Sequence, residues 1–220
     1  MNIKRYIATI ILAIVLLLNF SCTDWLDVKP VDRMSEDQLY STEAGFRQAL
    51  NGIYVELNHA DLYGDELLVN TVEILAQRYK FSSMGTLTNQ YHLAEFDYTT
   101  DYAKKCGSRI WEKAYALIAN VNKLLKNADS HKDLFTGDSY DLITGEAYAL
   151  RAFLHFDLLR LFGPVYKTHK EDKSICYNTQ FSLSGSDLLP ASKVMEYVIA
   201  DLKEAEDRLA KDPILSLIHI

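Results

Sequence analysis

The stretch from Gly145 to Tyr166 constrains the fold more than any other part of the chain. It reads GEAYALRAFLHFDLLRLFGPVY and is apolar on almost every side of the helix that it would form. A helix that is hydrophobic all round must be covered on all sides, by lipid or by other parts of the protein. Between Leu150 and Leu161 the stretch carries four ionisable residues, Arg151, His155, Asp157 and Arg160. These exclude a membrane span, so the stretch predicts the inner helix of a packed helical array.

The four ionisable residues do not converge as a catalytic cluster would. Arg151 and His155 are four residues apart and share one helix face, whereas Arg160 lies about half a turn further round. The alanines on the helix are small and permit close approach of a neighbouring helix. We therefore expect a structural role, in which the arginines bond helix ends or acidic residues on neighbouring helices.

Helical periodicity also recurs in the rest of the chain. The expected helices run from the caps Ser35 and Thr42 to Leu57, over 65–79, over 102–127, from Asp138 or Thr144 to Phe162, and over 191–210. Residues 80–101 and 166–190 have no helical period and are expected to be irregular. No convincing strands are found. The pattern predicts an all-α fold of tetratricopeptide-like stacked helix pairs.

The N-terminus is typical of an exported protein. Lys4 and Arg5 precede the apolar segment Tyr6–Phe20, which is shorter than the roughly 20 residues that span a bilayer. The segment ends at Ser21-Cys22, which resembles a bacterial lipobox. We expect residues 1–21 to be a signal peptide and Cys22 to carry lipid, against the alternatives of an ordinary signal peptide or an uncleaved anchor.

Composition excludes several functions. The formal net charge is -7 and no run of lysine or arginine appears, so a nucleic-acid partner is not expected. Cys106 and Cys176 lack the spacing of metal ligands and are expected to be two free thiols. No cofactor or metal is indicated. Glu95 and Asp97 could be read as the acid and base of a glycosidase, but they are near neighbours in an irregular segment, so we do not expect an enzyme.

Four motifs together resemble one known family. GEAYALRAFLHFDLLRLFGPVY resembles the signature helix of the SusD/RagB family of outer-membrane lipoproteins, with Tyr166 where proline is usual. Cys22-Thr23-Asp24-Trp25-Leu26-Asp27 resembles the family's mature start, and Ala49-Leu50-Asn51-Gly52-Ile53-Tyr54 its first long helix. Trp111, Tyr115, Ile118 and Asn122 match the helix before the signature. The order of the four motifs is that of the family.

The resemblance implies a function. Such proteins are helical, are held by lipid on the surface of Bacteroidota cells, and cover a SusC-like TonB-dependent transporter. They capture an oligosaccharide or polysaccharide for import and are not enzymes. The resemblance therefore predicts outer-membrane localisation. A RagB-like peptide-binding lipoprotein is an alternative within the same family, and a tetratricopeptide-type scaffold for protein partners is an alternative outside it.

The resemblance points to a region for the ligand rather than to a motif. In the family, contacts often come from the loop that corresponds to residues 80–101. Aromatic faces cover the C–H patches of sugars, and amides bond hydroxyls. The candidates chosen from this loop and its edge are Tyr79, Asn89, Tyr91 and Tyr98.

Family members are usually more than twice as long as this chain. The sequence LSLIHI at Leu215–Ile220 corresponds to codons that look like a library adaptor. We therefore expect residues 22–214 to be an incomplete SusD-like helical domain, and 215–220 to be an adaptor-derived tail.

Overall fold

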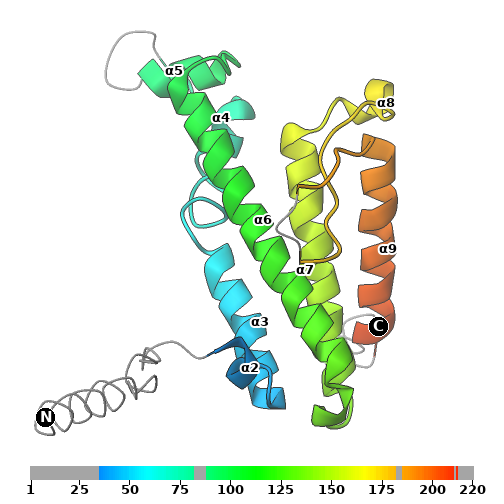
Figure 1. Cartoon of the computed structure of the whole chain (residues 1–220). Helices are drawn as coiled ribbons and strands as arrows, with labels where there is room; N and C mark the ends of the chain where they lie inside the picture. Colours follow the sequence, from blue (N-terminus) through cyan, green and yellow to red (C-terminus); the bar gives the residue numbers. More distant parts are fainter. Residues whose placement is uncertain (1–34, 82–87, 182–184, 211, 213–220) are drawn as a thin grey trace, which may run out of the picture. The chain divides into compact units, whose positions relative to one another are not determined.

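The computed structural model describes residues 35–81, 88–181, 185–210 and 212 (Figure 1). The chain divides after Ser35 into two units, and the fold belongs to the second, which begins at Glu36. Its helices are α2 (Glu36–Leu39), α3 (Glu43–Leu57), α4 (Thr71–Leu75), α5 (Thr88–Ala94), α6 (Asp101–Ser130), α7 (Ser139–Phe162), α8 (Tyr166–His169) and α9 (Ala191–Leu209), with a 3₁₀ turn at Lys132–Leu134. The expected signal peptide, Cys22 and the tail 215–220 lie outside the described residues.

The long helices alternate in direction along the chain. In Figure 1, α3 and α6 are antiparallel, α6 and α7 are antiparallel, and α9 returns along α7. In the described residues the only pairing of the β type is one isolated bridge, Lys173 with Pro190. No helix in this part of the chain has the length and apolarity to cross a membrane. The prediction of an all-α fold of stacked helix pairs is confirmed.

Helix α7 is the inner helix that its sequence predicted. It contacts α3, α6 and, most extensively, α9. Ala147 and Ala152 are fully buried against these neighbours. At Gly145 a β-carbon would lie 2.9 Å from Leu209 Cγ and 3.0 Å from Arg208 Cβ, so the side chains of α9 leave no room for one. Small residues on α7 therefore set the distance between the two helices.

Helix α3 begins where the sequence predicted. The Thr42 side chain accepts a hydrogen bond from the Gly45 N–H at 3.1 Å, which satisfies one of the free donors of the first turn. Gly52 lies in the middle of this helix, and no atom comes within 4 Å of a β-carbon built there. This glycine serves no close helix contact and only weakens the helix.

The prediction of one helix over 65–79 is wrong, because only the short helix α4 forms within this range. Residues before it follow a series of turns in which the Asp65 carbonyl accepts from the N–H groups of Leu68, Val69 and Asn70. The buried Glu66 carboxylate accepts a hydrogen bond from the Thr71 hydroxyl and binds Arg109 of α6. A buried carboxylate needs such partners, and reaching them breaks the helical path.

The expectation for 80–101 is also partly wrong, since α5 forms within it. Leu93 and Ala94 of α5 are buried in a small cluster with Ile74 and Ala103. The Gln77 side chain donates to the Ala94 carbonyl at 2.6 Å and so ties α4 to α5. The expected loop 166–190 likewise contains the short helix α8.

The helical period of 191–210 predicts one inner face, made of Val194, Val198, Leu202, Ala205 and Leu209. Helix α9 matches the expected bounds but not the whole of this face. Val194, Val198 and Ala205 are buried as predicted, and Leu209 is half-buried. Leu202 was expected to face inward and is 47% exposed, so that prediction is wrong. Its neighbour Asp201 is buried instead.

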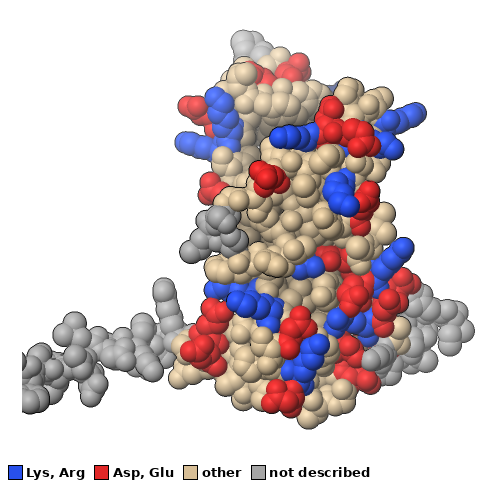
Figure 2. Space-filling model, turned by 45° about the vertical axis from the view of Figure 1, so that its right-hand side comes forward, with Lys and Arg blue, Asp and Glu red and all other residues tan. Residues whose placement is uncertain are grey.

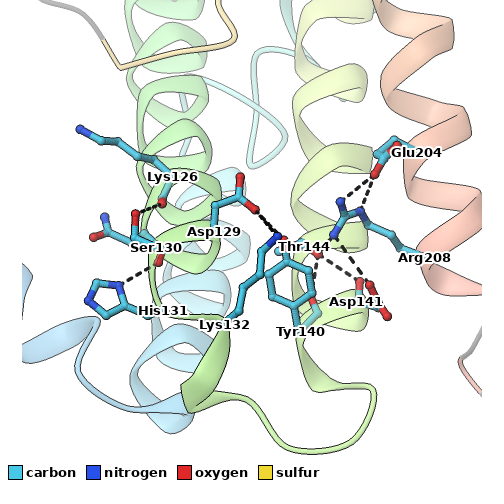
Figure 3. A network of polar contacts seen from close by, with 11 residues as sticks. Lys126, Asp129, Ser130, His131, Lys132, Tyr140, Asp141, Thr144, Glu204 and Arg208 are labelled. Atoms are coloured by element: carbon cyan, nitrogen blue, oxygen red, sulfur yellow. Dashed lines mark hydrogen bonds and ion pairs between the residues drawn. The ribbon is translucent and has the colours of Figure 1, made fainter.

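A polar network joins α6, α7 and α9 where α6 ends (Figure 3). The Tyr140 hydroxyl donates to Asp129 at 2.6 Å, and the Lys132 ammonium lies over the Tyr140 ring. Arg208 of α9 donates to the Thr144 hydroxyl at 2.7 Å and pairs with Glu204. Every member of this network binds another protein group, so the network holds three helices together and does not form a ligand site.

Candidate functional site

The polar residues of α7 bind protein rather than ligand. Two Arg151 nitrogens donate to the Asp201 carboxylate, Nε at 2.6 Å and Nη2 at 2.7 Å. Arg151 also donates to the Asn122 side chain at 2.9 Å. The expectation that Arg151 bonds an acid on a neighbouring helix is confirmed. For Arg160 the expectation is wrong, because its side chain is exposed and pairs with Asp157 of its own helix.

His155 is fully buried and holds the connection between α8 and α9 in place. Its Nδ1 lies 2.8 Å from the Arg151 carbonyl, and its Nε2 accepts the Asn178 N–H at 3.1 Å, which defines a neutral ring. The ring stacks on Tyr177, with centroids 3.9 Å apart. Burial lowers the pKa of His155 to about 4. With both nitrogens occupied, this histidine acts as a structural residue.

The four ligand residues predicted from the sequence do not line one common pocket. Tyr79 is exposed, and its hydroxyl donates to the Val69 carbonyl at 3.2 Å. Asn89 is exposed on α5, and Tyr91 is half-buried on the same helix. Tyr98 is 58% exposed just before α6, and it alone of the four lines a pocket formed largely by α6.

That pocket lies between the first half of α6 and the end of α7, and we call it the α6–α7 pocket. Its volume is about 600 Å³, within the usual range for small-ligand sites. Its lining consists of Thr71, Leu75, Leu93, Tyr98, Ala103, Lys104, Cys106, Gly107, Ser108, Ile110, Trp111, Glu112, Leu161 and Phe162. It is therefore mainly apolar, with three aromatic rings and a few polar groups.

Sequence reasoning missed most of this lining. Trp111 falls on the apolar stripe of its helix, a position typical of core residues. It is half-buried, with its ring edge-on to Phe162 at 5.2 Å between centroids. The available signal was on α6, where Lys104, Ser108 and Glu112 recur every four residues beside Trp111. Nothing in the sequence brings Phe162 to that helix.

The carboxylates considered as a glycosidase pair have ordinary structural roles. Glu95 is exposed. Asp97 accepts hydrogen bonds from the Thr99 hydroxyl and backbone N–H, and these bonds hold the pKa of Asp97 below its usual value. A general acid needs a raised pKa, so this geometry does not favour glycoside hydrolysis.

The remaining candidate features are also accounted for. Cys106 and Cys176 are free, as predicted. The described residues contain no group of three or more potential metal ligands. On the face drawn in Figure 2, acidic and basic side chains alternate, and neither sign gathers into a large patch. That face offers no basic surface of the kind that phosphate backbones need.

The fold and the pocket define a class of protein: an all-helical, tetratricopeptide-like domain with an aromatic pocket. The model of a SusD-like family, described as starch-binding and associating with the outer membrane, matches residues 24–217. The chain belongs to this SusD-like family.

Two curated relatives come from Formosa agariphila. SusD-like protein P2 is 27% identical over 208 residues, which are 94% of this chain and 38% of that protein. SusD-like protein P25 is 27% identical over 148 residues, which are 66% of this chain and 28% of that protein. The chain thus spans less than two-fifths of the length of either relative.

Solved structures share the fold. A SusD-like carbohydrate binding protein from Bacteroides vulgatus superposes with a TM-score of 0.64 at 21% identity, covering 78% of this chain and 36% of that one. A SusD superfamily protein from Bacteroides fragilis gives 0.63 at 18% identity, with coverage of 75% and 39%. These likenesses confirm the SusD-type helical fold.

Proposed function

We propose that this protein is a surface lipoprotein that binds carbohydrate without chemical turnover and passes it to a SusC-like TonB-dependent transporter. The observation that carries the proposal is the family match over residues 24–217, which starts two residues after Cys22. The names of two structural neighbours, a carbohydrate binding protein and a sugar binding protein, agree with this ligand class.

The lipid anchor follows from the same position in the chain. Cys22 directly follows the expected signal peptide, residues 1–21, and lies two residues before the start of the family match. Lipid on this cysteine would hold the protein at the outer membrane, since several acyl chains bind a bilayer firmly. Labelling cells with a fatty-acid analogue tests this: label should enter the wild-type chain and be absent from Cys22→Ser.

Binding without turnover fits the geometry of the described residues. The buried histidine is neutral with both nitrogens bonded, and Asp97 is held in its ionised form by Thr99. Neither residue is poised to donate a proton to a leaving group. The ligand would therefore leave the protein unchanged.

A binding screen tests the proposal directly. The full chain, purified in detergent, is titrated calorimetrically with neutral oligosaccharides, acidic oligosaccharides and short peptides. Saturable binding of an oligosaccharide with no released reducing sugar supports the proposal. Binding of peptides alone would assign the protein to the RagB-like alternative, and released sugar would make it an enzyme.

The partner is tested separately in cells. A tagged chain is isolated from detergent-solubilised outer membranes, and the proteins that come with it are identified. A TonB-dependent transporter in stoichiometric amount is the expected result. Its absence, together with retained glycan binding, would remove the import step from the proposal and leave the binding step.

A further inference from the structure

We propose that the α6–α7 pocket binds a pyranose ring of a neutral oligosaccharide, with the hydroxyl edge of the sugar along α6 and its C–H face on the pocket's aromatic wall. This inference rests on the proposed carbohydrate-binding function and names the site and the ligand class. Of the loop residues chosen from sequence, it keeps only Tyr98 in the site.

Two adjacent rows of α6 residues in the pocket lining differ in polarity. One row is Ala103, Gly107 and Trp111, and the row beside it is Lys104, Ser108 and Glu112. Residues four apart lie above one another on a helix, so the polar row forms a continuous edge about 12 Å long. A pyranose has the same two sides, with apolar C–H faces and a ring of hydroxyls.

The polar row is available to a ligand. Lys104, Ser108 and Glu112 are exposed. Within the described part of the chain, none of their side chains forms a hydrogen bond or an ion pair with another residue. An ammonium, a hydroxyl and a carboxylate together both donate to and accept from sugar hydroxyls.

The opposite wall is apolar and comes from another part of the chain. Phe162 and Leu161 of α7 line it, and Phe162 meets Trp111 edge-on. Tyr98 stands exposed at the start of α6. Aromatic side chains that keep free surface beside a pocket suit the C–H face of a sugar.

Gly107 is a second, independent indication that the space matters. Glycine weakens a helix interior, and here no neighbour requires it. A β-carbon at Gly107 would meet only Phe162 Cε1, at 3.6 Å, which is an ordinary contact. The missing side chain leaves the part of the pocket beside the Phe162 ring open.

The charges of the lining favour a neutral ligand. Lys104 and Glu112 stand at opposite ends of the polar row and carry opposite charges, and no other charged residue lines the pocket. An anionic sugar would be attracted electrostatically by Lys104 and repelled by Glu112. The two effects offset each other, so the site gives no net preference for charge, and neutral hydroxyls satisfy both groups.

The test compares two glycine substitutions at mid-helix positions. Gly107→Leu places a side chain in the pocket, while Gly52→Leu places the same side chain on the open surface of α3. Both are measured in the full chain, purified in detergent, by calorimetric titration with a neutral oligosaccharide that binds the wild type. Gly107→Leu should bind at least tenfold more weakly, and Gly52→Leu should bind as the wild type does.

A second pair of variants, with smaller changes, distinguishes lost binding from a folding defect in Gly107→Leu. Lys104→Gln should weaken binding several-fold, whereas Lys105→Gln, which changes an exposed neighbour outside the pocket, should leave binding unchanged. Wild-type affinity in both Gly107→Leu and Lys104→Gln would overturn the pocket assignment and leave the carbohydrate-binding function standing. If no oligosaccharide binds the wild type, the proposed function itself fails. Competition by short peptides for the pocket would replace the sugar with a peptide ligand.

Discussion

The Arg151 guanidinium binds both carboxylate oxygens of Asp201, at 2.6 and 2.7 Å, and thereby joins α7 to α9 inside the core. The side chains are 7% and 10% exposed. Asn122 and Tyr177 complete the network, and Tyr177 donates its hydroxyl to Asp201 at 2.6 Å. The arginine in the middle of the apolar helix α7 therefore has a structural role, because its buried charge is fixed by an acidic partner on α9.

Removing one member of this buried ion pair should destabilise the protein. Asp201→Asn leaves the Arg151 charge buried without its counter-ion, and we expect the free energy of unfolding to fall by about 3–5 kcal/mol. Urea denaturation measures the change. Glu196→Gln removes the exposed partner of Lys193 on the same helix and should leave the unfolding midpoint unchanged. Equal effects of the two variants would show that the Arg151–Asp201 pair contributes no more than a surface pair.

Acid should destabilise the fold through His155. In the unfolded chain a histidine titrates near 6.5, whereas burial lowers the pKa of His155 to about 4 in the fold. Between these values the unfolded state binds the proton more readily, so stability is constant above pH 6.5 and falls as the pH drops from 6.5 to 4. The total loss is about 3 kcal/mol.

The measurement compares urea unfolding at pH 7.5 and pH 5.0. His155→Gln keeps an amide donor and acceptor but cannot titrate. The wild type should lose about 2 kcal/mol more than this variant over that interval. Parallel pH profiles for the two proteins would rule out His155 as the titrating group.

Replacing two glycines by alanine should change the stability of the protein in opposite directions. Gly52→Ala adds a methyl group where no atom lies within 4 Å, so it should stabilise the protein by about 0.5–1 kcal/mol through helix propensity. Gly145→Ala places its methyl 2.9 Å from Leu209 Cγ and should force α9 outward, at a cost of about 1–3 kcal/mol. Thermal denaturation of both variants checks the signs. A stabilised Gly145→Ala would mean that α9 sits further from α7.

The tyrosines predicted from sequence should separate in a binding assay. Tyr98 lines the α6–α7 pocket, while Tyr79 binds the Val69 carbonyl outside it. Tyr98→Ala should weaken oligosaccharide binding about three- to tenfold, as expected when one aromatic contact is lost. Tyr79→Ala should leave the affinity unchanged. A stronger effect at Tyr79 would place the ligand at the loop edge.

The sequence predicts best where a structure depends on neighbours along the chain. Three local features are confirmed: the Thr42 cap, the bounds of α9 and the apolar surface on nearly all sides of α7. The failures involve distant partners. Residues 65–79 leave the helical path around Glu66, which binds Arg109 forty-three positions away. On α9, Asp201 faces inward because it binds Arg151, fifty positions away. Its neighbour Leu202 therefore faces outward.

The proposed site shows the same dependence. Tyr98 was chosen from the sequence because aromatic residues in a loop suggest ligand contact. Trp111 and Phe162 were not, because each lies on a periodic apolar stripe that looks like core. Their exposure depends on how far the ends of α6 and α7 separate, which helical periodicity does not determine.

The fluorescence of Trp111 tests the central claim most directly. The chain contains two tryptophans, so in Trp25→Phe the tryptophan signal comes from Trp111 in the pocket wall alone. Neutral oligosaccharides should shift its emission with saturation, at the affinity found by calorimetry, and short peptides should not. An oligosaccharide that binds by calorimetry without changing Trp111 emission would contradict the pocket. A chain that binds no oligosaccharide by either method would contradict carbohydrate capture itself.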